Sequence, residues 1–551
     1  MTGLLAAARW ARGLSAWTVA AGAIAAALLV PIAGVLSSLA TPRGELWAHL
    51  WQTQLPGLIL NTVLLLLGVG AGTLVLGTGL AYLVVSWRFP GRAVFDWLLI
   101  LPLAIPAYVI GFAFLGLLDF SGPIQTAFRH WAGPGARLPE LRSYGGVVLV
   151  MTLVFYPYVY LLARAAFREQ TAATLETARA LGLSGRGAFV AVTLPMARPS
   201  LVAGVSLAMM EALADFGTVA TFGYRTLTEA IYRVWLGMFD RAAATQLASL
   251  LLLFAFAVLT FERGLRGRAR FVQTHRRGPG VPAGTLRGWR AATATAICTA
   301  VIAAAFLVPV AQLLAWAFAE GSLALRFGRL LVNTLTLAGL AAAGVAIPAL
   351  VLAYAARLHP SPGVRLATRL AVMGYALPGS VIAVGILIPV AIVDHAVLRL
   401  ADAMLGRRLG LVLTGSVGAL LFAYVVRFIA VGVHTVDASL AKIPPSLDDA
   451  ARSLGAGIIG TLGRVHLPLM RGGVLTALVL VFVETMKEMP ATLLLRPFGF
   501  DTLAVAVWEA TSESLWGQAA IPALAIVGAG LLPVFVVIRL SGRAPVRRQV
   551  P

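Results

Sequence analysis

Long apolar stretches separated by short polar segments run the whole length of the chain. Twelve of these stretches reach the roughly 18 residues that a helix needs to cross a bilayer. They cover residues 17–40, 58–86, 97–118, 145–166, 199–222, 244–261, 291–318, 330–356, 370–393, 411–433, 473–495 and 519–540. Lipid cannot satisfy exposed backbone groups, and no alternating pattern of membrane β-strands is present. The pattern therefore predicts an all-α polytopic membrane protein with about twelve transmembrane helices.

The second half of the chain repeats the first. Short sequences recur at an offset of 272 residues: Asn61-Thr62 as Asn333-Thr334, Ala81-Tyr82 as Ala353-Tyr354, and Pro106 as Pro378. We therefore expect two homologous halves of six helices each, at residues 1–262 and 291–551, joined by an arginine-rich linker at 263–290. Each half has an even number of helices, so the duplication is predicted to be parallel, about an axis along the membrane normal.

Composition and charge agree with a membrane protein and exclude other classes. The chain is 60% hydrophobic and 12% charged, and its net charge is +21. The arginines lie in short segments between apolar stretches and form no single basic patch, which argues against a nucleic-acid-binding protein. The positive-inside rule places the linker and both termini in the cytoplasm, with the first stretch a retained span. Cys298 is the only cysteine, so an intrachain disulfide and a cysteine-based metal cluster are excluded.

One motif occurs once in each half, between apolar stretches. Glu176-Thr-Ala-Arg-Ala-Leu-Gly182 is followed after nine residues by Val192-Thr-Leu-Pro195, and Asp449-Ala-Ala-Arg-Ser-Leu-Gly455 after nine residues by Val465-His-Leu-Pro468. The spacing predicts two short helices joined at the glycine, with the proline in the first turn of the next helix. Such a loop, predicted to be cytoplasmic, can dock into a soluble partner. The acid can alternatively cap its own helix, with Ser446 completing a capping arrangement before Asp449.

Carboxylates inside the predicted spans are the second candidate site. Glu211 and Asp215 lie in the fifth span, and Glu484 and Glu488 lie at the same spacing in the eleventh. A spacing of four places each pair on one helix face, which we expect to turn toward the axis between the halves. The four acids can contact a cation on a translocation path, because hard cations favour oxygen ligands. They can alternatively do internal salt-bridge or gating work, with Lys487 or Arg427 as the partners.

Catalytic and cofactor motifs are missing from the sequence. Neither a phosphate-binding loop nor a His-Glu-x-x-His motif is present, and the seven histidines are scattered. We therefore predict no catalytic residue and no cofactor, and the sequence identifies no metal-binding set.

The repeated motif resembles the "EAA" loop of permeases from binding-protein-dependent ABC importers. The residues that match are Glu176, Ala178, Gly182, Leu194 and Pro195 in the first copy, and Asp449, Ala450, Ala451, Gly455, Leu467 and Pro468 in the second. Asp449 and Thr177 depart slightly from the family pattern. Three further stretches are similar to the ferric-iron branch of the family, in which two permease halves are fused: residues 101–111, 119–126 and 484–498.

This resemblance implies a bacterial inner-membrane transport subunit that is not itself an enzyme. It implies two copies of an ATP-binding cassette ATPase beneath the loops and a periplasmic binding protein that delivers ferric iron. Fused permeases for thiamine, phosphonate or polyamine are the alternative within the family. A proton-coupled secondary transporter or a purely structural membrane protein stays open as a different class, and co-purification of an ATPase would discriminate between these classes.

Overall fold

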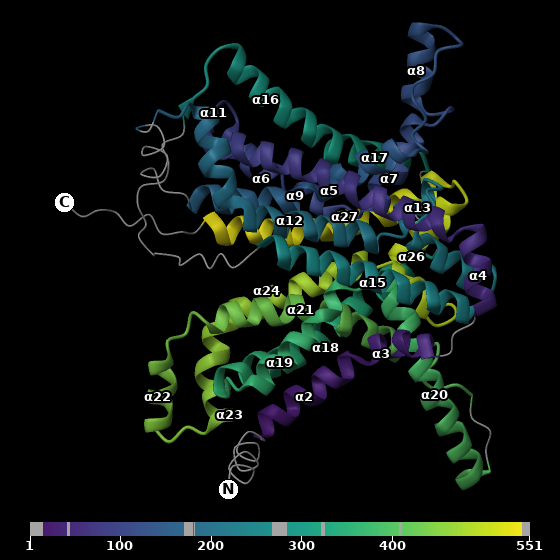
Figure 1. Cartoon of the computed structure of the whole chain (residues 1–551), viewed down its shortest axis with the longest axis vertical. Helices are drawn as coiled ribbons and strands as arrows, with labels where there is room; N and C mark the ends of the chain where they lie inside the picture. Colours follow the sequence, from purple (N-terminus) through teal and green to yellow (C-terminus); the bar gives the residue numbers. More distant parts are fainter. Residues whose placement is uncertain are drawn as a thin grey trace.

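The computed structural model describes residues 15–40, 44–169, 180, 182–266, 284–320, 326–406 and 410–542. Within these ranges the regular structure is helical except for two short parallel strands, β1 (Trp87–Arg88) and β2 (Gly284–Thr285), which pair with each other. The all-α fold predicted from the apolar pattern is confirmed (Figure 1).

The helices of the two halves follow each other in matching order. The first half contains α2 (Ala16–Leu28), α3 (Val30–Ser37), α4 (Gly44–Thr53), α5 (Leu55–Ser86), α6 (Arg92–Leu98), α7 (Ala107–Leu118), α8 (Pro123–Ala132), α9 (Tyr144–Glu169), α11 (Gly185–Ala188), α12 (Leu194–Ala214), α13 (Gly217–Thr221), α14 (Leu227–Tyr232) and α15 (Arg241–Arg266). The second contains α16 (Trp289–Ile302), α17 (Val308–Glu320), α18 (Phe327–Leu358), α19 (Pro362–Ala371), α20 (Gly379–Leu405), α21 (Val417–Leu440), α22 (Pro445–Ser453), α23 (Ile458–Thr461), α24 (Leu467–Lys487), α25 (Pro490–Leu495), α26 (Leu503–Ser512) and α27 (Trp516–Gly542).

The number of membrane spans agrees with the prediction. Eleven helices in the described ranges are long and apolar enough to cross a membrane, and the pair α2–α3, bent by 42°, makes a twelfth. Large apolar side chains on these helices face outward, such as Val75 on α5 and Ile347 on α18, which are 74% and 66% exposed. In a membrane these surfaces contact lipid tails, which explains why a chain of this composition does not need a polar coat.

Four spans differ most from their predicted positions, because prolines and short breaks shift them. The third and ninth spans begin directly after Pro106 and Pro378, each of which is preceded by a 3₁₀ turn that ends two residues before the proline. The fifth and eleventh spans run from Phe189 to Ala214 and from Ile458 to Lys487, so they begin 10 and 15 residues earlier than predicted, and each ends 8 residues earlier.

The Leu-Pro of each motif begins an α-helix that continues without a break from the helical turn before it. A π-helical turn, Phe189–Thr193 in the first half and Leu462–His466 in the second, comes immediately before α12 and α24. Pro195 and Pro468 are in the first turn of those helices. Proline supplies no N–H and clashes with the preceding turn of an α-helix, so a wider π turn lets the helix continue.

The duplication extends to side-chain contacts. In each half, the asparagine and threonine near the start of the second span bind the backbone of the segment that follows the broken fifth span. The bonds are Asn61 Nδ2 to Arg225 O (2.9 Å), Leu227 N to Thr62 Oγ1 (3.1 Å), Asn333 Nδ2 to Asp501 O (3.0 Å) and Leu503 N to Thr334 Oγ1 (2.9 Å). The repeated Asn-Thr pairs therefore have the same structural role in both halves.

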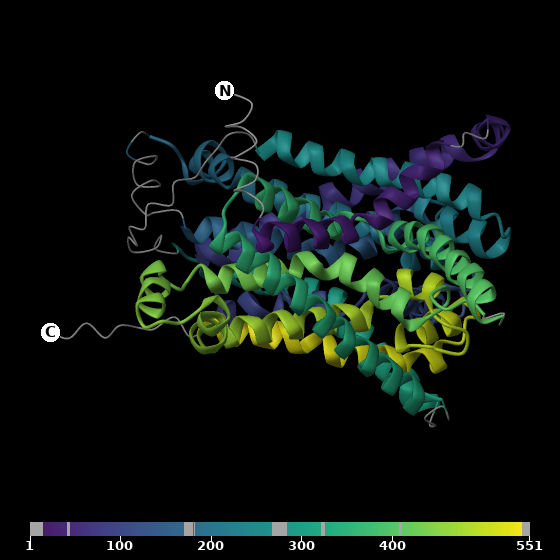
Figure 2. The same ribbon diagram turned by 90° about the horizontal axis from the view of Figure 1, so that it is seen from below.

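The first helices of the two halves are exchanged. Helices α2 and α3 pack on α18, α19 and α20 of the second half, whereas α16 and α17 lie beside α6 and α7 of the first half and also against α27 (Figures 1 and 2). The apolar pattern predicts such helices but does not identify their neighbours, so this exchange was not predicted. Because of this exchange, each half packs against the first helices of the other half.

We expect Gly34→Val to destabilise this exchanged packing. A Cβ atom at Gly34 on α3 would overlap the backbone oxygen of Gly385 on α20 and lie 3.3 Å from Pro389 Cδ. Overpacking at a close helix contact costs about 1–3 kcal/mol. The measurement is the thermal unfolding midpoint of the purified chain in detergent. Gly22→Val is the matched control, because no atom lies within 4 Å of a Cβ atom there; equal midpoints for the two variants would contradict the prediction.

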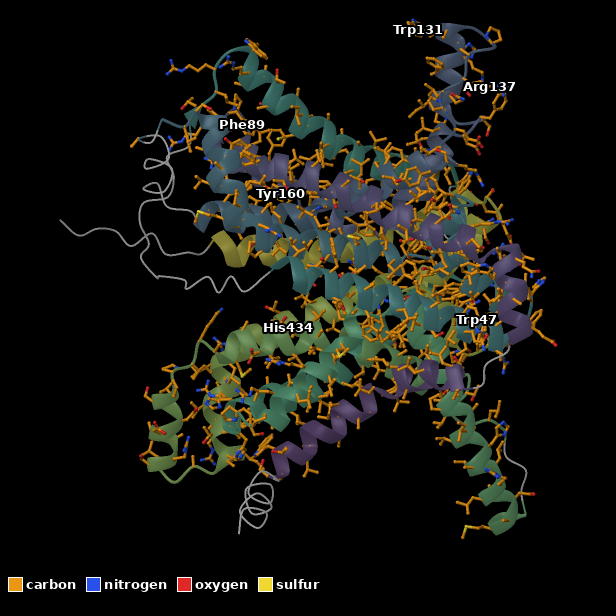
Figure 3. The ribbon with its side chains drawn as sticks, in the orientation of Figure 1. Trp47, Phe89, Trp131, Arg137, Tyr160 and His434 are labelled. Carbon is orange, nitrogen blue, oxygen red and sulfur yellow. The ribbon has the colours of Figure 1, made fainter. Side chains whose placement is uncertain are left out.

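The two ends of the molecule differ. One end, which we call the motif end, carries α11, α22 and α23, the start of α2 and the end of α27 (Figure 1). Helices α4 and α8 and the last turns of α20 lie at the opposite end, where α8 projects outside the helical body with Trp131 near its tip (Figure 3). Both motif copies thus lie on the same side, as a parallel duplication requires.

Candidate functional site

The second motif loop, residues 449–468, has the predicted shape. Helix α22 ends at Ser453, Gly455 adopts a left-handed conformation with φ = +78°, and α23 begins at Ile458. A left-handed residue between two helices favours glycine, because other residues pay for the Cβ contact. The joint exposes apolar side chains, since Leu454 is 87% and Ile459 83% exposed. The loop therefore presents a small, partly apolar surface at the motif end.

Asp449 faces outward on this loop and is not a helix cap. Its side chain is 73% exposed and lies 3.7 Å from Arg452. The N-cap position of α22 is Pro444, no side-chain capping bond is formed, and Ser446 is already within the helix. The capping alternative for this acid is therefore wrong. Of the two alanines, Ala450 is exposed and Ala451 is buried against the body.

The first motif loop, residues 176–195, is described only in part. Glu176 and Ala178 lie outside the described residues. Gly182 has φ = +84°, so it adopts the same left-handed conformation as Gly455. Leu194 and Pro195 begin α12 as Leu467 and Pro468 begin α24.

The four carboxylates within the spans line one cavity between the halves. This cavity has a volume of about 100 Å³, enough for several water molecules. Its walls come from the start of α7, the middle of α9, the ends of α12 and α24, and α21. Glu211, Asp215, Glu484 and Glu488 all contribute, together with the two basic residues Arg427 and Lys487. The duplicated acids thus meet at the junction of the two halves.

In each pair, the second acid lies just beyond the end of the helix that carries the first acid. Helices α12 and α24 end at Ala214 and Lys487, and the next residue, Asp215 or Glu488, is extended. The prediction that each pair shares one helix face is therefore wrong. Each of these two acids instead accepts a backbone hydrogen bond from the helix that restarts: Asp215 Oδ1 from Thr218 N at 2.7 Å, and Glu488 Oε1 from Ala491 N at 2.9 Å.

The two bases pair with the acids of the second half. Arg427 Nε lies 2.9 Å from Glu488 Oε2, and Lys487 Nζ lies 2.9 Å from Glu484 Oε1. Lys487 also donates to the backbone oxygen of Leu103, 3.2 Å away in the first half. Glu211 accepts a hydrogen bond from the Tyr375 hydroxyl of the second half at 3.3 Å. Cross-half contacts of this kind must change if the two halves move relative to each other.

The cavity has an excess of negative charge but no preformed metal centre. Four carboxylates against two bases leave a formal charge of −2 when all six groups are ionised. In the described part of the chain, no three His, Cys, Asp or Glu side chains are grouped so that they could hold a metal ion. An excess of carboxylates of this kind is electrostatically more favourable for a cation than for an anion.

Comparison with known proteins shows the family to which the chain belongs. Residues 73–270 match the family model described as "Binding-protein-dependent transport system inner membrane component". The "Fe(3+)-transport system permease protein FbpB 2" of Haemophilus influenzae is 28% identical to this chain, over 88% of this chain and 90% of the relative. The chain is a permease of the binding-protein-dependent ABC importer family. It is a multi-pass protein of the inner membrane, and its relatives are transport components.

Other relatives of the permease carry different names. The "Ferric transport system permease protein FbpB" of Actinobacillus pleuropneumoniae is 23% identical over 76% of this chain and 61% of the relative. The "Sulfate transport system permease protein CysT" of Escherichia coli is 28% identical, but over only 43% of this chain and 89% of its own length. The two relatives named for ferric transport therefore match across both halves, whereas the sulfate permease matches a length of about one half.

Several cavity residues of the permease could not be identified from the sequence. Tyr375, Tyr108 and Tyr158 bring phenol groups to or beside the acids, but a tyrosine in an apolar stretch has no pattern that separates it from packing residues.

Asp448 and His466, which are buried beneath the second motif loop, were also missed. Asp448 adjoins the motif acid, and the sequence does not show which of the two faces inward.

We expect Arg427→Ala to destabilise the permease strongly. The substitution leaves Glu488, which is 5% exposed, without its counter-charge, and breaking a buried pair from one side costs about 3–5 kcal/mol. Combining Arg427→Leu with Glu488→Gln should recover much of the loss, because the unpaired charge is then gone. Thermal unfolding in detergent measures both variants. A single variant as stable as the unchanged permease would show that the ion pair contributes nothing.

Proposed function

We propose that this permease imports ferric iron, which a periplasmic binding protein delivers and two copies of a separate ATPase drive across the membrane. The motif end is then cytoplasmic, together with both termini, and the end that carries α4 and α8 faces the periplasm. The chain itself hydrolyses no ATP; that reaction belongs to the partner beneath the motif loops. The two sequence halves, residues 1–262 and 291–551, act as the two moving parts, with the linker 263–290 between them.

The observation that carries the substrate proposal is the excess of carboxylates in the cavity between the halves. Fe(III) is a hard cation, and oxygen ligands suit such ions. A path with four carboxylates and two bases lowers the energy of a cation and raises that of an oxyanion. A relative that matches 88% of this chain is named for Fe(3+) transport, which agrees with this charge.

The charge of the cavity also distinguishes between the alternative substrates. Phosphonates are anions, so the cavity is unfavourable for them. Thiamine and polyamines are cations, and they remain alternatives for this path. A proton-coupled secondary transporter would not need paired loops with exposed apolar tips at one end, such as Leu454 and Ile459 on the second loop.

The test is uptake of radiolabelled Fe(III) by cells that lack the gene, with and without the gene restored. We expect uptake to depend on the gene, to stop when the partner ATPase is inactivated, and to persist in excess thiamine or polyamine. Uptake that is unchanged by loss of the gene, with other iron routes deleted, would overturn the ferric assignment. Competition by thiamine or by a polyamine would identify the substrate as that cation instead.

A further inference from the structure

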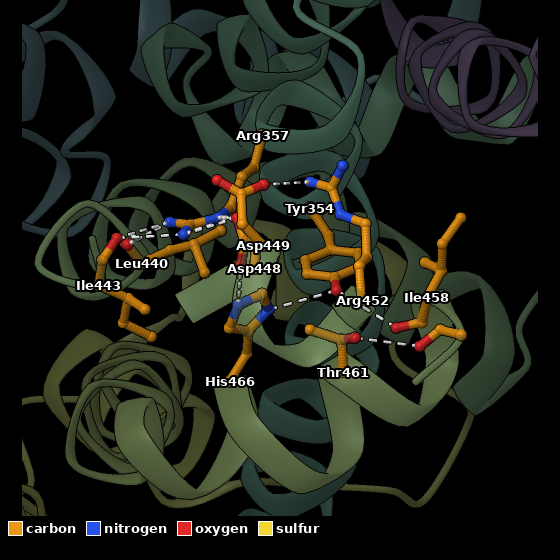
Figure 4. Close-up of polar contacts among 11 residues, drawn as sticks. Tyr354, Arg357, Leu440, Ile443, Asp448, Asp449, Arg452, Ile458, Thr461 and His466 are labelled. Atoms are coloured by element: carbon orange, nitrogen blue, oxygen red, sulfur yellow. Dashed lines mark hydrogen bonds and ion pairs between the residues drawn. The ribbon is translucent and has the colours of Figure 1, made fainter. Parts of the chain in front are cut away.

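A buried polar cluster lies beneath the second motif loop (Figure 4). His466 of the π turn is fully buried, and its Nε2 lies 2.5 Å from Asp448 Oδ1 on α22. On the other side of the ring, Nδ1 lies 3.2 Å from the hydroxyl of Tyr354 on α18. Arg357, one turn further along α18, completes the cluster with an ion pair of 2.9 Å to Asp448. We call these four residues the Asp448 cluster.

The Asp448 cluster joins five helical elements through backbone as well as side-chain contacts. Arg357 donates to the carbonyl oxygens of Leu440 (2.8 Å), the last residue of α21, and Ile443 (3.1 Å), in the turn that follows it. Tyr354 donates to the carbonyl oxygen of Ile458 at the start of α23, at 3.3 Å. Helices α18, α21, α22 and α23 and the π turn before α24 are therefore connected at one point.

The hydrogen bonds of the cluster are mutually dependent. The Tyr354 hydroxyl has a single proton, which goes to the Ile458 carbonyl, and the Asp448 carboxylate accepts from Arg357. The imidazole of His466 lies between these two groups, with Nε2 facing Asp448 and Nδ1 facing the Tyr354 hydroxyl. A buried network of this kind fixes one geometry, because losing any member leaves the others without partners.

The first half keeps the tyrosine of this cluster and lacks the other three residues. At the repeat positions, Tyr354 corresponds to Tyr82, but Arg357 corresponds to Val85, Asp448 to Leu175 and His466 to Thr193. The ring of Tyr82 packs against the ring of Phe189, with centroids 4.2 Å apart. The ion cluster that the first half does have, Asp96 with Arg164 and Arg168, joins α6 to α9 and is formed by positions outside the motif.

We propose that Arg357, Asp448 and His466 are positioning residues that fix the second motif loop rigidly to α18 and α24. The second loop then moves together with these two helices when the ATPase moves it. This inference rests on the proposed function only for the identity of the partner that moves the loop. The rigidity itself is a property of this chain alone.

The test transplants the residues of the first half into the second. The triple variant Arg357→Val, Asp448→Leu and His466→Thr removes the cluster without leaving a buried charge, so it is expected to fold and enter the membrane. Thr193→Val is the matched control at the position that corresponds to His466. Cys298→Ala removes the single cysteine, and Leu454→Cys then places a spin label on the exposed end of α22.

Two readouts are measured on the full chain. The first is the mobility of the spin label in nanodiscs without ATPase or substrate, which we expect to rise in the triple variant and to stay unchanged in the control. The second is the amount of Fe(III) transported per ATP hydrolysed by the complete importer, which we expect to fall about tenfold in the triple variant. A merely structural role would lower the yield of importer without changing this ratio.

Two results would overturn the inference. A label that stays immobile in the triple variant would show that the cluster does not hold the loop. A mobile label with an unchanged transport ratio would show that the rigidity of this loop has no part in coupling. If the unchanged permease transports no Fe(III), the proposed function fails, and the label still reports on the cluster independently.

Discussion

Replacing both Gly182 and Gly455 with valine is expected to lower substrate uptake about tenfold or more while the permease still enters the membrane and binds its ATPase. Both glycines adopt left-handed backbone conformations, with φ of +84° and +78°. An L-residue pays about 1–2 kcal/mol at such a position, and a β-branched residue pays the most. The loop would relieve this strain by turning its two short helices away from the orientation that docks productively.

The matched control is the double substitution of the same two glycines with asparagine. Asparagine tolerates the left-handed conformation, and among the described residues, chain neighbours apart, no atom lies within 4 Å of a Cβ atom at either position. If backbone conformation is the reason for glycine, the asparagine variant transports normally and the valine variant does not. Equal loss in both would mean that the ATPase itself needs the space. Normal uptake by the valine variant would refute a role for the glycines in coupling.

The measurement separates coupling from assembly. Uptake is normalised to the amount of permease in the membrane, and binding is followed by co-purification of the ATPase. The expected pattern is full co-purification with low uptake, because the exposed tip residues Leu454 and Ile459 are unchanged.

The features predicted from the sequence are those that depend on local pattern. Span number followed from apolar length, and the bend at Gly455 followed from glycine between two helical stretches. The repeat also predicted that Asn61 and Asn333 would be equivalent, and they form the same bond to the backbone after the broken span. These features require only the chemistry of a residue and its neighbours along the chain.

The features that were missed depend on contacts between distant segments. An apolar helix has no marker for its partner, so the packing of α3 on α20 through Gly34 and Gly385 could not be predicted. The break before Asp215 and Glu488 was missed because no proline or glycine precedes either acid within its helix turn. In the eleventh span a new helix, α25, begins at Pro490. This proline marks the break only once the structure is known.

Neutralising the four cavity acids is expected to divide them into two classes. Glu488 and Asp215 each accept a backbone hydrogen bond, and Glu488 also pairs with Arg427. Their amide variants, Glu488→Gln and Asp215→Asn, should reduce the amount of folded permease as well as transport. Glu211 and Glu484 accept no backbone hydrogen bond among the described contacts; their partners are the side chains of Tyr375 and Lys487. Their variants should assemble normally.

Glu211→Gln is the variant expected to affect transport most selectively, because in the described structure this acid pairs with no base. Removing one of four carboxylates from the path weakens the attraction for a cation, and a loss of about 1.4 kcal/mol would lower uptake about tenfold. Uptake per assembled permease measures this effect, with co-purification of the ATPase as the assembly test. Glu513→Gln, an exposed acid at the opposite end from the motif loops, controls for charge alone. If Glu211→Gln loses assembly and not transport, this acid holds the two halves together through Tyr375, and the path for the cation must use the carboxylate of Glu484 instead.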